Sequence, residues 1–298
     1  MTAPSHWPRA GRDWPHRERS EFVRAGGIVW HVQTWGKGPV LLLLHGTGSA
    51  THTWNGLLPR LVDRFRVVAV DLPGHGFTDL VPGTQATLPG MANLLSALLD
   101  QLDIEPALAV GHSAGAAILV RLCLDRRIAP AALISLNGAF VPFGRMAAPL
   151  FSGAARLLAA SRVVPYVVAI QGLRRRSIEN VIEQTGSRLE EDDLDNYRTL
   201  IRQPRHISGT LRMMANWDLE SLWRELPQLT VPLVLVACDK DLAVKPVQAE
   251  RLVKRVPKAR LLQVADLGHL GHEEQPEEFA EIIKSTAREY GLLRAASA

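Results

Sequence analysis

"LAVGHSAGAAILV", residues 108–120, is an apolar stretch that changes its period at a serine placed between two glycines. The residues before Gly111 are continuously apolar, which is typical of a short buried strand, whereas residues 116–124 have helical spacing. The stretch therefore predicts a strand that turns sharply into a helix at Ser113. Two interpretations of this serine are open. It caps the helix, as serine often does, or it is the exposed nucleophile of a G-x-S-x-G turn.

Strands and helices alternate on both sides of this turn. The predicted strands cover residues 27–35, 39–46, 66–74, 106–112, 131–138, 231–241 and 260–266. The predicted helices cover residues 53–65, about 87–103, 114–125, about 246–256 and about 276–290. This alternation predicts an α/β fold with a mostly parallel central sheet flanked by helices.

The alternation lapses between the two halves of the sheet, where the sequence is helix-like and has no obvious strand. We therefore expect a polar N-terminal leader at residues 1–21. The α/β core would consist of residues 22–140 and 230–298, and residues 141–229 would form a helical cap or lid. The start of the cap is apolar and punctuated by Arg145, Arg156 and Arg162. It would be either a buried lid or a face for a membrane surface or a flat apolar ligand.

Composition narrows the class of protein. The chain has 298 residues, 47% of them hydrophobic and 21% charged, which is typical of a packed globular protein. The net charge of +4 is too small to predict nucleic-acid binding. Two cysteines in separate elements predict neither a disulfide framework nor a cysteine metal site. We find no secretory signal and no membrane span, so a cytoplasmic location is expected.

Polar residues follow several predicted strands, and functional groups collect beyond the carboxyl ends of strands in open parallel sheets. These residues are His45–Gly48, Asp71, Ser113, Asn137, Asp239, Asp241 and the loop with His269. A serine hydroxyl becomes a good nucleophile when a base and an orienting acid lie within hydrogen-bonding reach. The order serine, aspartate, histidine is the one expected of an α/β-hydrolase.

His269 is the preferred base, because it follows the last strand on a glycine-flanked loop. We expect His272 to sit near the start of the closing helix and to face solvent. Asp241 is preferred over Asp239 as the acid, because the chain must leave the sheet before a carboxylate can point back at His269. Catalysis would also need backbone donors for an oxyanion, which we assign to Thr47 and Ala114.

Two other kinds of site are less compatible with the sequence. "GTGSAT" (46–51) follows a strand, with Asp71 about twenty residues further on, as in a dinucleotide fold, but Thr51 replaces the third glycine and would crowd the helix. His269, His272 and Glu273 do not have regular metal-ligand spacing. We therefore predict no cofactor and no bound metal.

Five motifs occur in the order found in the α/β-hydrolase superfamily, which the chain resembles over residues 22–292. They are "HGTGS" (45–49), "DLPGHGFTD" (71–79), "GHSAG" (111–115), the aspartates 239 and 241, and "GHLGHEEQP" (268–276). The resemblance implies that Ser113, Asp241 and His269 are nucleophile, acid and base. Cys238 departs from the pattern, since many relatives have glycine before the acid, and the choice between the two aspartates stays open.

Further segments resemble a narrower family, the magnesium-chelatase accessory proteins of bacteriochlorophyll biosynthesis. These segments include "DWPHRERSEFV" (13–23), "SLNGAF" (135–140) and "MMANWDL" (213–219). The resemblance implies a pathway in photosynthetic bacteria and leaves the reaction open.

Three functions are compatible with these features. The first is a serine hydrolase of an ester or related acyl substrate, for example on a tetrapyrrole side chain. The second is a non-catalytic porphyrin-binding accessory factor, and the third is a carbon–carbon bond hydrolase with the same triad. The expected partners are the small-molecule substrate, magnesium chelatase and a peripheral membrane surface, and not nucleic acid.

Overall fold

The computed structural model describes residues 3–5, 7–142, 165–166, 169 and 175–294. Arg145, Arg156 and Arg162, which we singled out as contacts for a membrane or ligand, lie outside the described residues. The division into leader, core and cap stays a proposal. The described residues 175–229, which lie in the chain between the sixth and seventh strands, are called the insertion.

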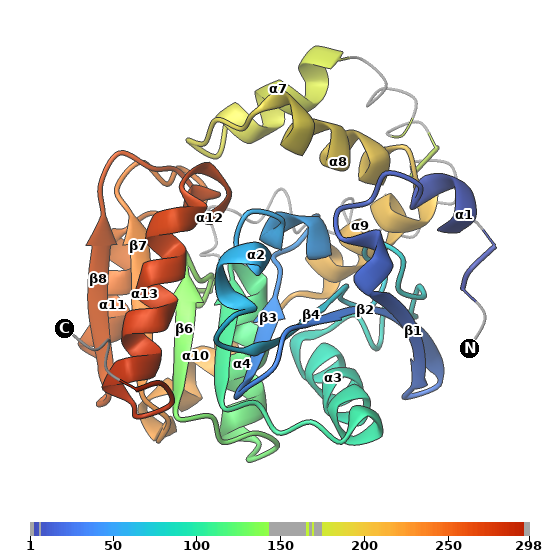
Figure 1. Ribbon diagram of the computed structural model, residues 1–298. Helices are drawn as coiled ribbons and strands as arrows, with labels where there is room; N and C mark the ends of the chain where they lie inside the picture. Colours follow the sequence, from blue (N-terminus) through green and yellow to red (C-terminus); the bar gives the residue numbers. More distant parts are fainter. Residues whose placement is uncertain (1–2, 6, 143–164, 167–168, 170–174, 295–298) are drawn as a thin grey trace.

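Within the described part of the chain, eight strands form one sheet in the order β1-β2-β4-β3-β5-β6-β7-β8 (Figure 1). The strands are β1 (Ser20–Ala25), β2 (Ile28–Trp35), β3 (Val40–Leu44), β4 (Arg66–Val70), β5 (Leu108–His112), β6 (Ala132–Leu136), β7 (Leu233–Cys238) and β8 (Ala259–Val264). The pairs β1·β2 and β2·β4 are antiparallel, and every other pair is parallel. The predicted α/β fold with a mostly parallel sheet is confirmed.

Helices occupy both faces of the sheet and the insertion. They are α1 (Trp7–Ala10), η1 (Arg17–Arg19), η2 (Thr51–Trp54), α2 (Leu58–Leu61), α3 (Leu88–Leu102), α4 (Ala114–Leu124), α7 (Arg175–Glu183), α8 (Glu191–Ile201), α9 (Pro204–Asn216), α10 (Glu220–Glu225), η4 (Leu226–Gln228), α11 (Val247–Val253), α12 (Gly271–Glu274) and α13 (Pro276–Glu289). The helical periodicity of α3, α4, α11 and α13 is visible in the sequence.

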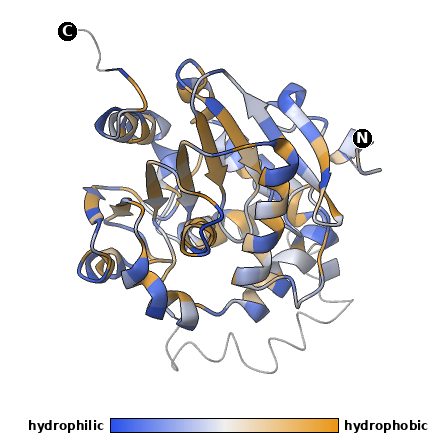
Figure 2. Ribbon diagram, turned by 90° about the horizontal axis from the view of Figure 1, so that it is seen from below, coloured by the Kyte–Doolittle hydropathy of each residue, from blue (hydrophilic) through white to orange (hydrophobic). Residues whose placement is uncertain are grey.

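Two hydrophobic cores lie against the two faces of the sheet. Leu42 and Leu44 of β3 pack with α3, α4 and α10, whereas Leu41 and Leu43 pack with α2 and α13. Alternate residues of a strand point to opposite faces, so a strand buried on both sides reads as one apolar run. Figure 2 shows the apolar strands in the middle of the molecule, between helices that present hydrophilic residues outward.

Two local predictions are wrong. The helix expected over residues 53–65 is split into η2 and the single turn α2, because Gly56 packs directly against Pro276 and Pro59 starts a new helix in its first turn. The sequence does not predict the edge strand β1, because its residues before Ala25 are half-buried or exposed and show no clear alternation.

The segment expected as a polar leader carries two buried tryptophans. Trp7 and Trp14 are 7% and 4% exposed, and both rings lie edge-on against Phe77. The indole Nε1–H of Trp14 donates to Thr51 Oγ1 at 3.1 Å. Trp7 and Trp14 therefore belong to a small hydrophobic cluster with Phe77 and Ala50, next to η2.

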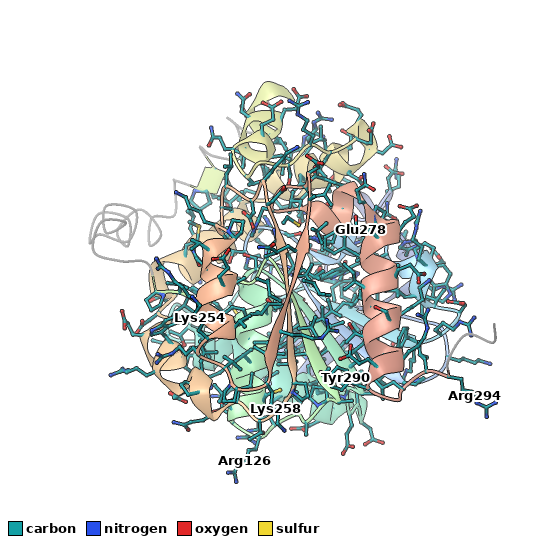
Figure 3. All side chains as sticks on the ribbon, turned by 90° about the vertical axis from the view of Figure 1, so that its left-hand side faces the viewer. Arg126, Lys254, Lys258, Glu278, Tyr290 and Arg294 are labelled. Atoms are coloured by element: carbon teal, nitrogen blue, oxygen red, sulfur yellow. The ribbon has the colours of Figure 1, made fainter. Side chains whose placement is uncertain are left out.

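Helices α7, α8 and α9 of the insertion lie at the carboxyl ends of the parallel strands, whereas α10 packs beside α4 (Figure 1). Figure 3 shows Arg126 and Lys258 at the opposite end of the sheet from α7 and α8. Polar residues that follow the parallel strands therefore face the insertion. None of the helices in the described residues is long and apolar enough to cross a membrane.

We predict that Trp14→Ala lowers the free energy of unfolding by about 3–5 kcal/mol, the usual range for truncating a buried aromatic side chain. Urea denaturation followed by far-UV circular dichroism measures this loss. Arg12→Ala, at an exposed position in the same segment, is the matched control and should change stability little. A loss below about 1 kcal/mol for Trp14→Ala would mean that the segment packs only loosely.

Candidate active site

Ser113 lies at the turn between β5 and α4, with φ 50° and ψ −117°. A non-glycine residue in this region is strained, and such strain is typical of a serine exposed on a strand-to-helix turn. The Ser113 side chain makes no capping hydrogen bond to α4, which argues against the interpretation that it merely caps the helix. Its side chain is half-buried, at the edge of the sheet that faces the insertion.

Two glycines let the neighbouring loop approach Ser113. A Cβ on Gly115 would lie 2.3 Å from Leu44 O, so only glycine lets the start of α4 abut the end of β3. A Cβ on Gly46 would lie 3.0 Å from Ser113 Cβ. The loop that follows β3 therefore runs directly beside the serine.

His269 and Asp241 are brought together by the loops after β8 and β7. His269 Nδ1 lies 2.8 Å from Asp241 Oδ2, and the Asp241 side chain is 1% exposed. Because an ionised carboxylate only accepts hydrogen bonds, Nδ1 carries the proton and Nε2 is left as the basic nitrogen. Asp239 is exposed and does not contact His269 through any described hydrogen bond. Of the two candidate acids, only Asp241 reaches the histidine.

Asp241 is fixed by three further donors. Its Oδ1 accepts the backbone N–H groups of Ala243 at 2.8 Å and Val244 at 2.7 Å. Asn137 Nδ2 donates to Asp241 Oδ2 at 2.7 Å and to Gly268 O at 3.2 Å. Sequence reasoning placed Asn137 at a strand end without a role. In the structure, it ties the acid to the loop that carries His269.

His112, next to Ser113, joins this loop to the serine turn. His112 Nε2 donates to His269 O at 3.0 Å, and the two ring centroids are 4.6 Å apart. No hydrogen bond joins the Ser113 hydroxyl to His269 within the described residues. Catalytic hydrogen bonds are often long without substrate and tighten when it binds, so the arrangement is compatible with a serine–histidine pair.

The two expected oxyanion donors lie on either side of this turn. Ala114 is the first residue of α4, and Thr47 follows Gly46 on the loop beside Ser113. Neither backbone N–H donates to an atom of the described residues. Both are therefore free for an oxygen bound next to Ser113.

Asp71 has a structural role, because both of its carboxylate oxygens accept hydrogen bonds from the protein itself. Its Oδ1 accepts the Thr51 N–H at 2.7 Å, and its Oδ2 accepts the Phe77 N–H at 2.9 Å and contacts His31 Nδ1 at 2.7 Å. Burial alone would raise the pKa of Asp71, but the neighbouring His31 ring and the hydrogen bonds hold it below its ordinary value.

The prediction that His272 faces solvent is wrong. The one-turn helix α12 turns His272 inward, where it is 1% exposed and its ring lies 5.0 Å from Trp54 and 4.5 Å from His112. Its Nε2 donates to Thr53 Oγ1 at 2.9 Å. Burial lowers the pKa of His272 to about 3, with a smaller contribution from His269, so the ring is neutral.

Glu273 beside it is a buried carboxyl that links α12 to the insertion. Its Oε1 accepts the Tyr197 hydroxyl of α8 at 2.7 Å and the Thr53 hydroxyl of η2, and its side chain is 4% exposed. Burial raises the pKa of Glu273 to about 8. Among the described residues, no group of three or more His, Cys, Asp and Glu side chains is arranged to hold a metal ion.

A sequence model of the Alpha/beta hydrolase family matches residues 41–282. The chain belongs to the alpha/beta hydrolase family. The superfamily resemblance seen in the five motifs is thereby confirmed.

Several individual proteins are similar to the chain over most of its length. The chain is 37% identical over 269 residues to the magnesium-chelatase 30 kDa subunit of Rhodobacter capsulatus, an alignment that covers 89% of this chain and 94% of that protein. It is 32% identical over 273 residues to the pimeloyl-[acyl-carrier protein] methyl ester esterase of Aromatoleum aromaticum, covering 84% and 98%. A solved alpha/beta hydrolase fold protein from Burkholderia ambifaria superposes with a TM-score of 0.74 at 25% identity, covering 89% of this chain and 97% of that one.

We predict that raising the pH from 6 to 9 destabilises the wild-type protein more than Glu273→Gln. Because the folded-state pKa of Glu273 is raised to about 8 from an ordinary 4.5, its contribution to stability is complete below about 4.5 and is lost as the pH rises through about 8. The difference should be on the order of 2 kcal/mol in urea denaturation.

Glu278→Gln, which changes an exposed glutamate of α13, is the control and should keep the wild-type pH dependence (Figure 3). If Glu273→Gln and wild type lose stability in parallel, Glu273 titrates as an ordinary glutamate.

Proposed function

We propose that the protein is a serine hydrolase of a carboxylic ester, with Ser113 as nucleophile, His269 as base and Asp241 as acid. The observation that carries the proposal is the hydrogen bond from His269 Nδ1 to the buried Asp241, on a loop that His112 ties to the serine turn. This bond selects the tautomer in which His269 Nε2 can take a proton from a serine hydroxyl.

The reaction would follow from this geometry. Ser113 Oγ attacks the ester carbonyl carbon while His269 Nε2 takes the hydroxyl proton, and the N–H groups of Thr47 and Ala114 donate to the oxyanion. His269 then gives the proton to the departing alcohol, which leaves an acyl group on Ser113 Oγ. A water attacks this acyl group while His269 Nε2 takes its proton, and the proton passes to Ser113 Oγ as the bond to the acyl carbon breaks and the carboxylic acid leaves. Asp241, held by its four hydrogen bonds, stabilises the imidazolium that forms in each step.

We also propose that residues 141–229 form a cap over this site and that the ester belongs to tetrapyrrole metabolism. The position of α7 and α8 at the carboxyl edge of the sheet supports a cap (Figure 1). The pathway rests on the relative from Rhodobacter capsulatus, which is named a magnesium-chelatase subunit. The relatives named methyl ester esterases favour a methyl ester as substrate.

We predict that a fluorophosphonate probe labels the wild-type protein at Ser113 and that Ser113→Ala abolishes labelling. Ester hydrolysis by Ser113→Ala should fall at least about a thousandfold with the melting temperature unchanged, since members of a triad act as one unit. Mass spectrometry of the labelled peptide identifies the modified serine. Ser285→Ala, at an exposed serine of α13, is the control and should label fully.

Two results would contradict hydrolysis at Ser113. Labelling that persists in Ser113→Ala would mean that another residue is the nucleophile. An unlabelled wild-type protein that binds a porphyrin methyl ester without cleaving it would favour a non-catalytic accessory factor. If the probe labels Ser113 but only a ketone substrate turns over, the protein would be a carbon–carbon bond hydrolase with the same triad.

We predict that Asn137→Ala lowers kcat by about 10- to 100-fold with KM little changed, because it removes a hydrogen bond to the charged Asp241. Steady-state ester hydrolysis measures both constants. Asn180→Ala, at an exposed position in α7, is the control. An unchanged kcat would show that the backbone donors of residues 243 and 244 suffice to orient Asp241.

A further inference from the structure

The loop that carries Thr47 is a tight turn held at its entry by a histidine. Ser49 N donates to Gly46 O at 3.3 Å, and Gly48 has φ +80°, the conformation that favours glycine at the third position of a type II turn. His45 Nδ1 donates to the same Gly46 O at 2.7 Å. Because Gly46 O and the Thr47 N–H belong to one planar peptide, this bond fixes the direction of the Thr47 N–H.

A second histidine, from the insertion, holds the exit of the turn. His206 of α9 is 2% exposed, and its Nε2 donates to Gly48 O at 3.2 Å. Its Nδ1 accepts the Gly76 N–H at 3.0 Å, which requires a neutral ring with the proton on Nε2. Burial lowers the pKa of His206 to about 4, with a smaller contribution from His45, so this state is the one present near neutral pH.

The two histidines make the same kind of bridge. Each ring gives an N–H to a carbonyl of the turn and accepts a backbone N–H from the loop after β4, since His45 Nε2 accepts the Leu72 N–H at 2.9 Å. The turn and the 72–76 loop are thus joined at two points. The His45 bridge is made within the core. The His206 bridge exists only while α9 packs against the core.

The backbone of α9 packs so closely against the 72–76 loop that His206 is held in place. Gly209, one turn after His206, lies against Gly74, and a Cβ at position 209 would come within 1.9 Å of Gly74 O. The His206 ring also lies edge-on to His75, with centroids 5.5 Å apart. The helix therefore has little freedom to slide along the loop it contacts.

We propose that His206 is a positioning residue, which holds the Thr47 turn in the conformation that presents its N–H to the oxyanion and so links the docking of α9 to catalysis. This inference rests on the proposed function. A loosened turn would still bind the ground-state ester, but its N–H would no longer be preorganised for the charge that develops in the transition state.

The test compares His206→Phe with His206→Gln. Phenylalanine keeps a ring against His75 but loses both hydrogen bonds, whereas glutamine offers one donor and one acceptor. We expect kcat for ester hydrolysis to fall about tenfold in His206→Phe, part of the loss seen when an oxyanion donor is removed, with KM within about twofold. His206→Gln should recover most of kcat. Affinity for a trifluoromethyl ketone, which forms a tetrahedral adduct on serine, should fall in proportion to kcat/KM.

The matched control is His52→Phe, another buried histidine beside the insertion. Its ring lies edge-on to Tyr197 at 4.5 Å, and neither ring nitrogen has a hydrogen-bond partner among the described residues. This variant should keep the wild-type kcat. Hydrogen exchange of a peptide over residues 45–51 should accelerate in His206→Phe and stay at the wild-type rate in His206→Gln and His52→Phe.

Wild-type kcat and exchange in His206→Phe would overturn the inference while the proposed function stands. Equal losses in His206→Phe and His206→Gln, with lowered melting temperatures, would also overturn it, because His206 would then act only in packing. A wild-type protein that neither reacts with fluorophosphonate nor cleaves esters would overturn the proposed function, and the catalytic role of His206 with it.

Discussion

The backbone at Ser113 is the constraint on which the site depends. A serine with φ 50° is strained by about 1–3 kcal/mol, so the surrounding structure must hold it. It does so through β6 and the loop that follows it, since Ser113 N donates to Leu136 O at 3.0 Å and Ala139 N donates to Ser113 O at 3.2 Å. The strain is thus supported by central strands of the sheet, and the hydroxyl is fixed at the edge where the other strand-end residues gather.

The insertion contacts the core at both loops that would serve this serine. At the histidine loop, Gly186 lies against the backbone of Gly268, and His269 N donates to Thr185 O at 3.3 Å. At the Thr47 loop, α9 makes the corresponding contact through Gly209. A side chain at either glycine contact would push the insertion away. A displacement of the insertion would therefore disturb the base and the oxyanion donors together.

Neutral imidazoles form much of the wall around the site. Burial lowers the pKa of His45, His75, His112 and His206, so these rings carry no charge. His45 and His206 each donate and accept a hydrogen bond, whereas His75 and His112 each donate one to a backbone carbonyl. These four rings therefore act as rigid, uncharged hydrogen-bonding spacers.

The sequence predicts what is local and misses what depends on distant contacts. The change of period at Ser113 and the strand-end positions of Asp241 and His269 are readable because they follow from spacing along one strand and one turn. The burial of His272 is not readable, because its partner Thr53 is 219 residues away in the chain. His206 lies in an amphipathic helix without a motif, and its bonds to Gly48 and Gly76 span 158 and 130 residues.

With ten histidines in the chain, residue type alone cannot separate a base from a spacer. What separates them is the set of partners of both ring nitrogens. His269 has a carboxylate at Nδ1 and no partner for Nε2 among the described residues, whereas both nitrogens of His206 bond to backbone groups. For His206, these partners are set by the packing of α9 on the core.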